Sequence, residues 1–316
     1  MFNMVVRNVN HAYWNIWWQF KVNGVRRESR NGPVVRLPGP FMTAYQNPRE
    51  RVLFDAERDA NPVFHLMECI WMMAGSMDVK WLSQFNARMV EYSDGGLIMG
   101  AYGARWAEEN QLQRIVDELR EKPHSRQCVL QMWDVKRDLG SPFKDRPCNT
   151  HVYFEIDDGK LNMTVCCRSN DALWGAYGAN AVHFSFLQEV MASSIGVPVG
   201  TYYQFSNNLH AYLNVPIVEK LVDSPPYAGV DPYSAGTVTL IPILEPGDTL
   251  QELIEDCQDM LSDIDPYRTR FVTKVAHPLM EAYLLRKAGQ PYDIDLIPDC
   301  DWKKAFIEWI ERREAK

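Results

Sequence analysis

The sequence predicts an α/β (α+β) fold, a mixed sheet packed with helices, and three features of the chain lead to this prediction. β-patterned runs alternate with helical runs along the first two thirds of the chain. Two helical runs, near Pro62 and near Ala181, are apolar on most sides, which is typical of buried helices. After about Asn214 only loops and helices follow. We therefore expect one main domain at residues 1–214 and a helical C-terminal extension at residues 215–316 that packs on the same domain.

The composition limits the class of protein. The chain has 316 residues, 46% of them hydrophobic, so it can bury a substantial core. A net charge of −8 argues against binding to polymeric nucleic acid, although local arginine clusters can hold a small phosphate. Seven cysteines without regular spacing fit free thiols in a reducing compartment. The N-terminus has neither a signal-peptide core nor the ~18 apolar residues of a membrane span, so we expect a cytoplasmic protein without membrane contact.

The N-terminal segment alternates between apolar and polar residues. Residues Val5, Trp14, Ile16, Trp18, Phe20 and Val22 follow this alternation and suggest strands, with Asn23-Gly24 as a hairpin turn. The next segment, Arg26 to Pro33, predicts a basic turn before another extended run. A solvated surface loop is the alternative interpretation of this turn.

The run from Pro62 to Gly75 is helical and nearly all apolar, with one carboxylate, Glu68, inside it. A lone carboxylate among apolar side chains is costly unless it is paired or protonated, and such groups cluster at active sites. Glu68 is therefore a candidate catalytic residue. The alternative is an ion pair at a subunit interface.

The remaining elements follow the hydrophobic pattern. In chain order, the sequence predicts a turn-like aromatic stretch at Met99–Trp106, a helix at Gln111–Glu121, a buried strand at Cys128–Trp133, a strand at Leu161–Val165, a helix at Ala181–Ile195, a strand at Val199–Phe205, and helices at Thr249–Ser262, His277–Lys287 and Trp302–Arg313. A proline-punctuated section, beginning at Pro225 and Pro226, precedes the last three helices. No cysteine or histidine spacing indicates a metal site.

Cys148 is the candidate nucleophile. It follows a proline and precedes an alternating run, Val152 to Asp157, so it lies at a strand entrance where a thiol can be exposed and positioned. The polar run Arg168-Ser169-Asn170-Asp171 follows the next strand. His210 and Tyr212 follow the strand after the Ala181 helix.

These polar residues resemble the active-site signature of the thymidylate synthase and pyrimidine nucleotide hydroxymethylase superfamily. The residues that carry the resemblance are Cys148, the run Arg168 to Asp171, Asn180, His210 and Tyr212. The spacing matches as well as the residue types, because Arg168 lies 20 residues after the cysteine and His210 lies 30 residues after Asn180. The family's buried glutamate corresponds to Glu68 with Trp71 and Gly75. Its tyrosine-glycine turn corresponds to Tyr102-Gly103, and its first phosphate-binding arginine to Arg30.

The resemblance implies a mixed-sheet fold and a folate-dependent one-carbon transfer to C5 of a pyrimidine deoxynucleotide. A Cys148 thiolate would add to C6 of the ring so that C5 becomes a nucleophile. Positive neighbours would lower the pKa of this thiol. The other implied roles are catalysis by Glu68, Tyr102 and Asp171, phosphate binding by Arg30, Arg126, Arg168 and Ser169, uracil recognition by Asn180, and sugar binding by His210 and Tyr212. The one-carbon donor would be 5,10-methylenetetrahydrofolate, and a homodimer would place Arg126 at the partner's phosphate site.

Each of these residues also has a plainer interpretation. Cys148 is alternatively a buried structural cysteine, Asn180 a helix cap, and His210 a core histidine. Aligned without a gap, Ala179 rather than Asn180 takes the position of the base reader.

Several departures from the family bear on the product. Asn149 replaces the histidine that follows the cysteine, Gln127 replaces the second of the paired arginines, and the loop before Asn180 has one extra residue. The family's shielding tryptophan is absent near residues 87–92, and the charged stretch at residues 308–316 replaces an apolar tail. A methylene group at C5 is reduced by hydride only in a dry pocket, so these changes favour water.

The sequence therefore favours a dUMP hydroxymethylase that forms 5-hydroxymethyl-dUMP and tetrahydrofolate. The alternatives are a thymidylate synthase that forms dTMP and dihydrofolate, a dCMP or CMP hydroxymethylase, and a non-catalytic nucleotide-binding protein.

Overall fold

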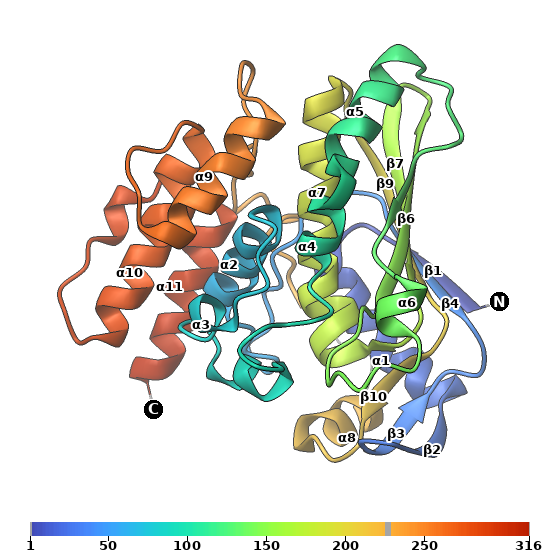
Figure 1. The fold of residues 1–316 in the computed structure, drawn as a ribbon. Helices are drawn as coiled ribbons and strands as arrows, with labels where there is room; N and C mark the ends of the chain where they lie inside the picture. The colour runs from blue at the N-terminus through green and yellow to red at the C-terminus, as the bar shows by residue number, and fades with distance from the viewer. Residues whose placement is uncertain (1, 225–228, 316) are drawn as a thin grey trace.

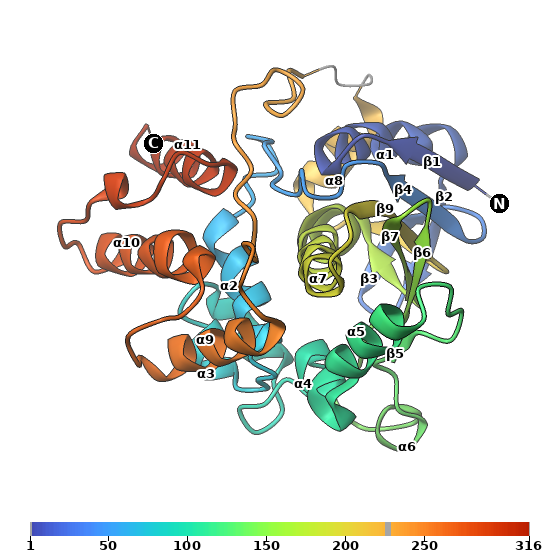
Figure 2. The same ribbon diagram turned by 90° about the horizontal axis from the view of Figure 1, so that it is seen from above.

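The computed structural model describes residues 2–224 and 229–315. Pro225, Pro226 and Lys316 lie outside the described residues. Figures 1 and 2 show a mixed sheet on one side of the molecule, helices α5 and α7 against the inner face of that sheet, α2 behind α7, and α9, α10 and α11 outermost. The predicted α/β fold with a mixed sheet packed with helices is confirmed.

Two sheets carry the site. The large sheet has six strands in the order β1-β4-β9-β7-β6-β5, and the small sheet has four in the order β2-β3-β10-β8. The strands are β1 (Phe2–Val6), β2 (Val25–Ser29), β3 (Gly32–Arg36), β4 (Phe41–Tyr45), β5 (Val129–Gln131), β6 (Asn149–Asp157), β7 (Lys160–Cys167), β8 (Asn170–Asp171), β9 (Val199–Ser206) and β10 (Leu209–Tyr212). β7 and β9 are parallel whereas β6 and β7 are antiparallel, so the large sheet is mixed.

The helices fill the space on the inner face of the large sheet and beyond it. They are α1 (Val9–Asn23), α2 (Pro62–Met73), α3 (Val79–Leu82), η1 (Ala87–Tyr92), α4 (Tyr102–Ala107), η2 (Glu108–Asn110), α5 (Gln111–Glu121), α6 (Val135–Asp138), η3 (Ala172–Ala179), α7 (Asn180–Ile195), α8 (Pro216–Asp223), α9 (Leu250–Ser262), η4 (Val272–Ala276), α10 (His277–Lys287), η5 (Ile294–Leu296) and α11 (Asp301–Glu314).

The two apolar helices predicted from the sequence form the centre of the core. Helix α2 begins after Asn61, whose side chain accepts hydrogen bonds from the first-turn amides, and Pro62 occupies the first turn. Helix α7 is buried along nearly its whole length and ends at Gly196. Because α2 packs on α7 and α7 packs on the sheet, polar residues on these two helices lie deep inside the molecule.

The N-terminal prediction was wrong beyond Val6. Residues 9–23 form a helix, not strands, because its buried residues recur at helical spacing at Val9, Tyr13, Ile16 and Phe20. Trp18 and Val22, which extend the alternation in the sequence, point outward with 43% and 58% of their surface exposed. The predicted turn at Asn23-Gly24 is the end of this helix, where the Gly24 amide donates to Phe20 O. The β-hairpin lies later, between β2 and β3.

Two other predictions need correction. The stretch at residues 99–106 is helical from Tyr102 onward, because α4 packs tightly on α2. A side chain at Gly103 would come within 2.0 Å of Met72 O, so only glycine fits there. The predicted buried strand at residues 128–133 is a three-residue edge strand, and Val129 on it is 43% exposed.

The C-terminal helices lie where the sequence predicts them. Helices α9, α10 and α11 cover the side of α2 that faces away from α7 (Figure 2). All seven cysteines are free, as predicted. Within the described residues, no helix combines the length and the apolar content needed to cross a bilayer. None of the described residues form a cluster of His, Cys, Asp or Glu suited to a metal ion.

Candidate active site

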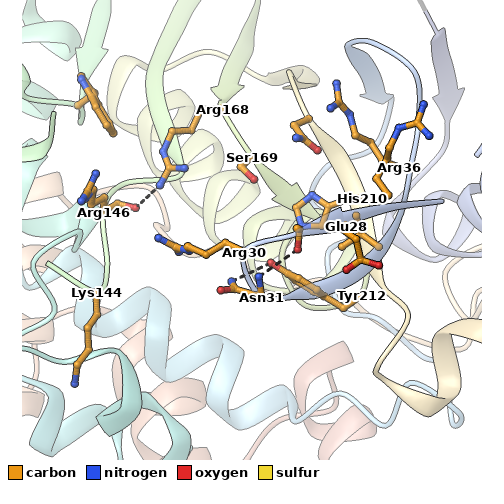
Figure 3. A pocket seen from close by; sticks show the side chains of 15 residues that line it. Glu28, Arg30, Asn31, Arg36, Lys144, Arg146, Arg168, Ser169, His210 and Tyr212 are labelled. Carbon is orange, nitrogen blue, oxygen red and sulfur yellow. Dashed lines mark hydrogen bonds between the residues drawn. The ribbon is translucent and has the colours of Figure 1, made fainter. Parts of the chain in front are cut away.

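A basic cavity of about 390 Å³ lies between the small sheet and the segment that leads into β6 (Figure 3). Six of its lining residues are cationic, and Glu28 is the only acidic one among the described residues that line it. We call it the basic cavity; it is lined by Arg27, Glu28, Ser29, Arg30, Asn31, Val34, Arg36, Trp133, Lys144, Arg146, Arg168, Ser169, Asn208, His210 and Tyr212. So many cations around one small space favour a phosphorylated ligand.

The small sheet positions one wall of the basic cavity. Arg30 and Asn31 form the turn between β2 and β3, and Arg30 extends into the cavity toward the side that carries Arg168 (Figure 3). His210 and Tyr212 lie two residues apart on β10 and therefore point to the same side. Their rings meet edge to face at 5.1 Å between centroids, and the Tyr212 hydroxyl accepts a hydrogen bond from Asn31 Nδ2 at 3.3 Å.

Arg168 forms the opposite wall and holds the candidate nucleophile in place. Its Nε donates to Pro147 O at 2.9 Å and its Nη2 to Arg146 O at 3.0 Å. Its backbone amide donates to Cys148 O at 2.8 Å. The segment that ends in Cys148 is therefore fixed by one arginine, which still has unused donors facing the cavity.

The Cys148 thiol lies beside these cations but is mostly buried. Burial raises the pKa of the thiol above its ordinary value, Asp145 adds to the rise, and the charges of Arg168 and Arg30 oppose it. The predicted lowering of this pKa is therefore wrong in sign, because desolvation outweighs the two arginines. The arginines still favour the thiolate, which is the nucleophilic form.

Next to Cys148 lies a second group of residues, which we call the inner cluster: Glu68, Tyr102, Asn149, Asn180 and His183. The Tyr102 hydroxyl accepts from the backbone amide of Asn149 at 3.3 Å and from its Nδ2 at 2.9 Å. Asn149 Nδ2 also donates to Asn180 Oδ1 at 3.0 Å. The structure thus places Asn180 beside the residue that follows the cysteine, whereas Ala179 has no side-chain group that could recognise a base.

The extra residue before Asn180 has a structural explanation. Residues 172–179 form a wide π-type turn, in which the Asn180 amide donates to Gly175 O five residues earlier. Such a turn absorbs a single inserted residue without changing the helix that follows. The insertion is therefore contained in η3, and α7 begins with Asn180.

Glu68 comes to the inner cluster from α2. Its Oε2 lies 3.0 Å from Nε2 of His183, which is three residues after Asn180 on the same face of α7. Both atoms are buried, and neither makes a well-directed hydrogen bond within the described residues. His183 was not predicted from the sequence, although its i+3 spacing from Asn180 places both side chains on one face of the helix.

Asp171 lies next to His210 in the small sheet, where β8 pairs with β10. Its Oδ1 accepts from the Trp174 amide at 2.6 Å, and its Oδ2 is buried without a partner in the described part of the chain. Burial raises the pKa of Asp171 to about 6. Trp174 is 45% exposed and stacks on Arg58, with 4.3 Å from the guanidinium to the ring centroid.

The structure brings together most of the predicted site residues but not all of them. Arg30, Arg168, Ser169, His210 and Tyr212 line the basic cavity, and Cys148, Tyr102, Asn180 and Glu68 lie inward of it. Arg126 lies elsewhere, on a separate surface hollow that it shares with Glu118 and Lys122. Three further lining residues were not predicted from the sequence, because only the fold brings them into the cavity: Lys144, Arg146 and Trp133.

The comparisons with known proteins agree with this site. Residues 11–229 match the family described as Thymidylate synthase. The chain is 46% identical to a protein named deoxyuridylate hydroxymethyltransferase from Pseudomonas phage M6, over 98% of this chain and 93% of the relative. It is 37% identical to a protein of the same name from Bacillus phage SP01, over 55% of this chain and 50% of the relative. A thymidylate synthase from Symbiobacterium thermophilum is 27% identical over 47% of this chain and 58% of the relative.

The fold and the site therefore define an enzyme that transfers a one-carbon unit to a pyrimidine nucleotide from a folate donor. The chain belongs to the thymidylate synthase family.

Proposed function

We propose that the protein adds a hydroxymethyl group to C5 of dUMP. The observation that carries the proposal is the arrangement of a nucleophile, Cys148, between a basic cavity that fits a nucleotide phosphate and an amide, Asn180, that fits a pyrimidine edge. The relatives from phages M6 and SP01 are named for the same reaction.

Each of the site residues has its own role in binding the nucleotide or in the reaction. The phosphate binds to Arg30 and Arg168, and His210 and Tyr212 hold the sugar. Asn180 offers one amide oxygen to N3–H of uracil and one amide nitrogen to O4. The Cys148 thiolate adds to C6, so that C5 becomes nucleophilic and takes up the one-carbon unit. Glu68 moves protons at O4 and C5.

The residues beside the site also fit a pterin. Trp174 offers an exposed flat ring, and the unpartnered Oδ2 of the neighbouring Asp171 offers an acceptor for a ring N–H. We propose that the donor is 5,10-methylenetetrahydrofolate, which supplies a carbon at the oxidation level of formaldehyde. Trp174 and Asp171 would hold its pterin.

Access of water supports hydroxymethylation over methylation. Residues 87–92, where the family's shielding tryptophan is missing, form η1, in which no side chain is buried. The C-terminal helices pack against α2, and no described residue after Tyr212 lines the basic cavity. Since neither residues 87–92 nor the C-terminal helices line the cavity that would hold the nucleotide, we expect water to reach the methylene at C5 and give the hydroxymethyl product.

One assay tests the proposed function. The enzyme is incubated with dUMP and methylenetetrahydrofolate, and absorbance near 340 nm is followed to detect dihydrofolate. The mass of the nucleotide product is measured by mass spectrometry. We expect an added CH2O mass without dihydrofolate. Dihydrofolate formed in step with a methylated nucleotide would identify a thymidylate synthase and overturn the proposal. Cys148→Ser serves as the control, because it should abolish turnover and keep dUMP binding, whereas a non-catalytic binding protein would be indifferent to it.

We also propose that the protein is a homodimer in which the large sheets pack back to back. Paired positions across the six strands place Val5, Ala44, Tyr203, Thr164, Tyr153 and Val129 in one row on the same face. Val5, Tyr153 and Val129 in this row are 63%, 45% and 43% exposed. Arg126 lies three residues before Val129, the first residue of the edge strand β5. From this edge Arg126 would reach the phosphate bound by the partner. A monomeric mass at micromolar concentration with full activity would contradict the shared site.

A further inference from the structure

A continuous chain of three asparagine side chains, Asn149, Asn180 and Asn170, begins in the inner cluster. Asn149 Nδ2 donates to Asn180 Oδ1, Asn180 Nδ2 donates to Asn170 Oδ1, and Asn170 Nδ2 donates to Ser206 Oγ, each at 3.0 Å. Asn149 and Asn170 are almost fully buried, with 0% and 1% of their surface exposed. At one end Asn149 Nδ2 also donates to the Tyr102 hydroxyl, at the other end the Ser206 hydroxyl accepts, and the three bonds from Asn149 to Ser206 are all donated in the same direction.

Asn180 has capacity left for a ligand. An amide oxygen accepts two hydrogen bonds and an amide NH2 donates two. Asn149 uses one acceptor position of Asn180, and Asn170 uses one of its donors, so one acceptor and one donor remain for the base. Gly175 keeps this arrangement free of side chains, because a Cβ there would lie 2.9 Å from Asn170 Oδ1 and 3.3 Å from Asn180 Nδ2.

The direction of the chain matters because the two pyrimidines differ by an exchange of donor and acceptor. Uracil presents N3–H as donor and O4 as acceptor, whereas cytosine presents N3 as acceptor and its 4-amino group as donor. Turning the Asn180 amide by 180° exchanges its oxygen and nitrogen and therefore converts complementarity to one base into complementarity to the other.

Neither end of the chain fixes this direction. Tyr102 and Ser206 are hydroxyls, which can each donate or accept. All three amides could turn together with the same number of bonds along the chain, but Asn180 alone could not, because it would then face a donor at Asn149 and an acceptor at Asn170. The orientation of Asn180 is therefore coupled to that of its two neighbours, and a neighbour that can only accept hydrogen bonds would fix it.

We propose that the shared direction of this amide chain, in which Asn149 and Asn170 are coupled to Asn180, decides whether Asn180 binds uracil or cytosine. Asn149 and Asn170 are positioning residues that do not need to touch the nucleotide. The proposal rests on the proposed function, in which Asn180 is the group that binds the base. It adds that base choice belongs to three residues and not to one.

The same chemical change at the two neighbours should have opposite outcomes. In Asn149→Asp the ionised carboxylate only accepts, so Asn180 must turn its Nδ2 toward residue 149 and its Oδ1 toward Asn170. Asn170 then turns as well and accepts from Ser206 Oγ. In Asn170→Asp the carboxylate accepts from Asn180 Nδ2 and from Ser206 Oγ, so the original direction is kept.

The experiment measures binding of dUMP and dCMP by calorimetry to the wild type and both variants, at pH 7 and pH 9. We expect Asn149→Asp to raise the affinity for dCMP relative to dUMP by about 10- to 100-fold, the value of one bidentate base contact. The shift should be larger at pH 9, where a buried aspartic acid is more fully ionised. Asn170→Asp should keep the ratio of the wild type. An unchanged ratio in Asn149→Asp at pH 9, or equal shifts in both variants, overturns the proposal.

A further variant and the activity assay make the result unambiguous. Asn149→Ala removes the donor without imposing a direction, so its affinities for dUMP and dCMP should become similar. If Asn149→Asp does not fold, retention of base preference in Asn149→Ala overturns the proposal instead. If the wild type fails to add CH2O to dUMP, the proposed function fails whatever the binding ratios are. If the wild type adds CH2O to dUMP but the ratios of dCMP to dUMP affinity are the same in the variants as in the wild type, only the proposed role of the amide chain is wrong.

Discussion

Oε2 of Glu68 lies 3.0 Å from Nε2 of His183, so a carboxylate from α2 and an imidazole from α7 meet inside the inner cluster. The His183 side chain is only 3% exposed, and that of Glu68 is 15% exposed. Neither atom makes a well-directed hydrogen bond within the described residues. The histidine therefore limits where the carboxylate can lie while leaving its oxygen open to a substrate proton or to water.

This arrangement predicts that Glu68 acts in proton transfer. Glu68→Gln keeps the size of the side chain but cannot take up a proton, so we expect kcat to fall about 10²- to 10⁴-fold while dUMP affinity changes little. Steady-state assays of hydroxymethyl-dUMP, paired with calorimetry of dUMP binding, measure the two effects separately. His183→Gln, as the matched variant, should lower kcat less and move the pH profile. A Glu68→Gln enzyme with undiminished kcat would remove Glu68 from the mechanism.

The thiol of Cys148 gives a second prediction, based on its raised pKa. Iodoacetamide reacts with the thiolate, so alkylation of the Cys148 peptide should accelerate with pH through a midpoint above that of an ordinary thiol. Arg30→Ala removes a charge that favours the thiolate, so alkylation at pH 8 should become slower. Mass spectrometry of the Cys148 peptide distinguishes this thiol from the other six, and Cys166, which is also partly exposed, serves as the internal control. Faster alkylation in Arg30→Ala would contradict the electrostatic role of this arginine.

The parts of the site that could be predicted from the sequence are those whose position is determined by the residues next to them in the chain. Cys148 and Arg168 flank the paired strands β6 and β7, so their spacing in sequence becomes proximity in space. Helix α7 was predicted within one residue, because an apolar run that ends in Gly196-Val197-Pro198 has few other structures available.

The parts that could not be predicted depend on contacts between distant segments. His183 is one buried histidine on an apolar helix, and only the packing of α2 on α7 places it at Glu68. Lys144 and Arg146 reach the basic cavity from a loop with no regular pattern. Helix α1 was wrongly predicted as strands. Trp18 and Val22 are apolar residues on its exposed side, and together with the buried residues they produce the alternation of apolar and polar residues that is typical of a strand.

Asn180 gives a third prediction, which concerns the base. An ionised aspartate at this position only accepts hydrogen bonds, so it repels O4 of uracil and accepts from the amino group of cytosine. Asn180→Asp should therefore raise kcat/KM for dCMP relative to dUMP by at least about 10-fold. Product masses from the two nucleotides, assayed in competition, measure this ratio directly. An unchanged ratio in Asn180→Asp would show that Asn180 is not the base reader.

The last prediction concerns stability and follows from Asp171. Burial raises its pKa in the folded protein to about 6 from an ordinary 3.8. Because the folded state prefers the protonated acid, this side chain contributes stability that is complete below about pH 3.8 and is lost as pH rises through 6. Two pKa units correspond to about 3 kcal/mol in the free energy of unfolding.

The substitution Asp171→Asn tests this, because an asparagine side chain imitates the neutral acid and its Oδ1 can still accept from the Trp174 amide. The variant should therefore match the wild type near pH 4 and exceed it by about 2 to 3 kcal/mol at pH 7. Urea unfolding of both proteins at pH 4, 5, 6 and 7 measures the difference. Burial also raises the pKa of Asp301 to about 6, but this residue is present in both proteins and cancels in the comparison. A stability difference that stays constant or shrinks from pH 4 to pH 7 would show that Asp171 is not held in the protonated form by its surroundings.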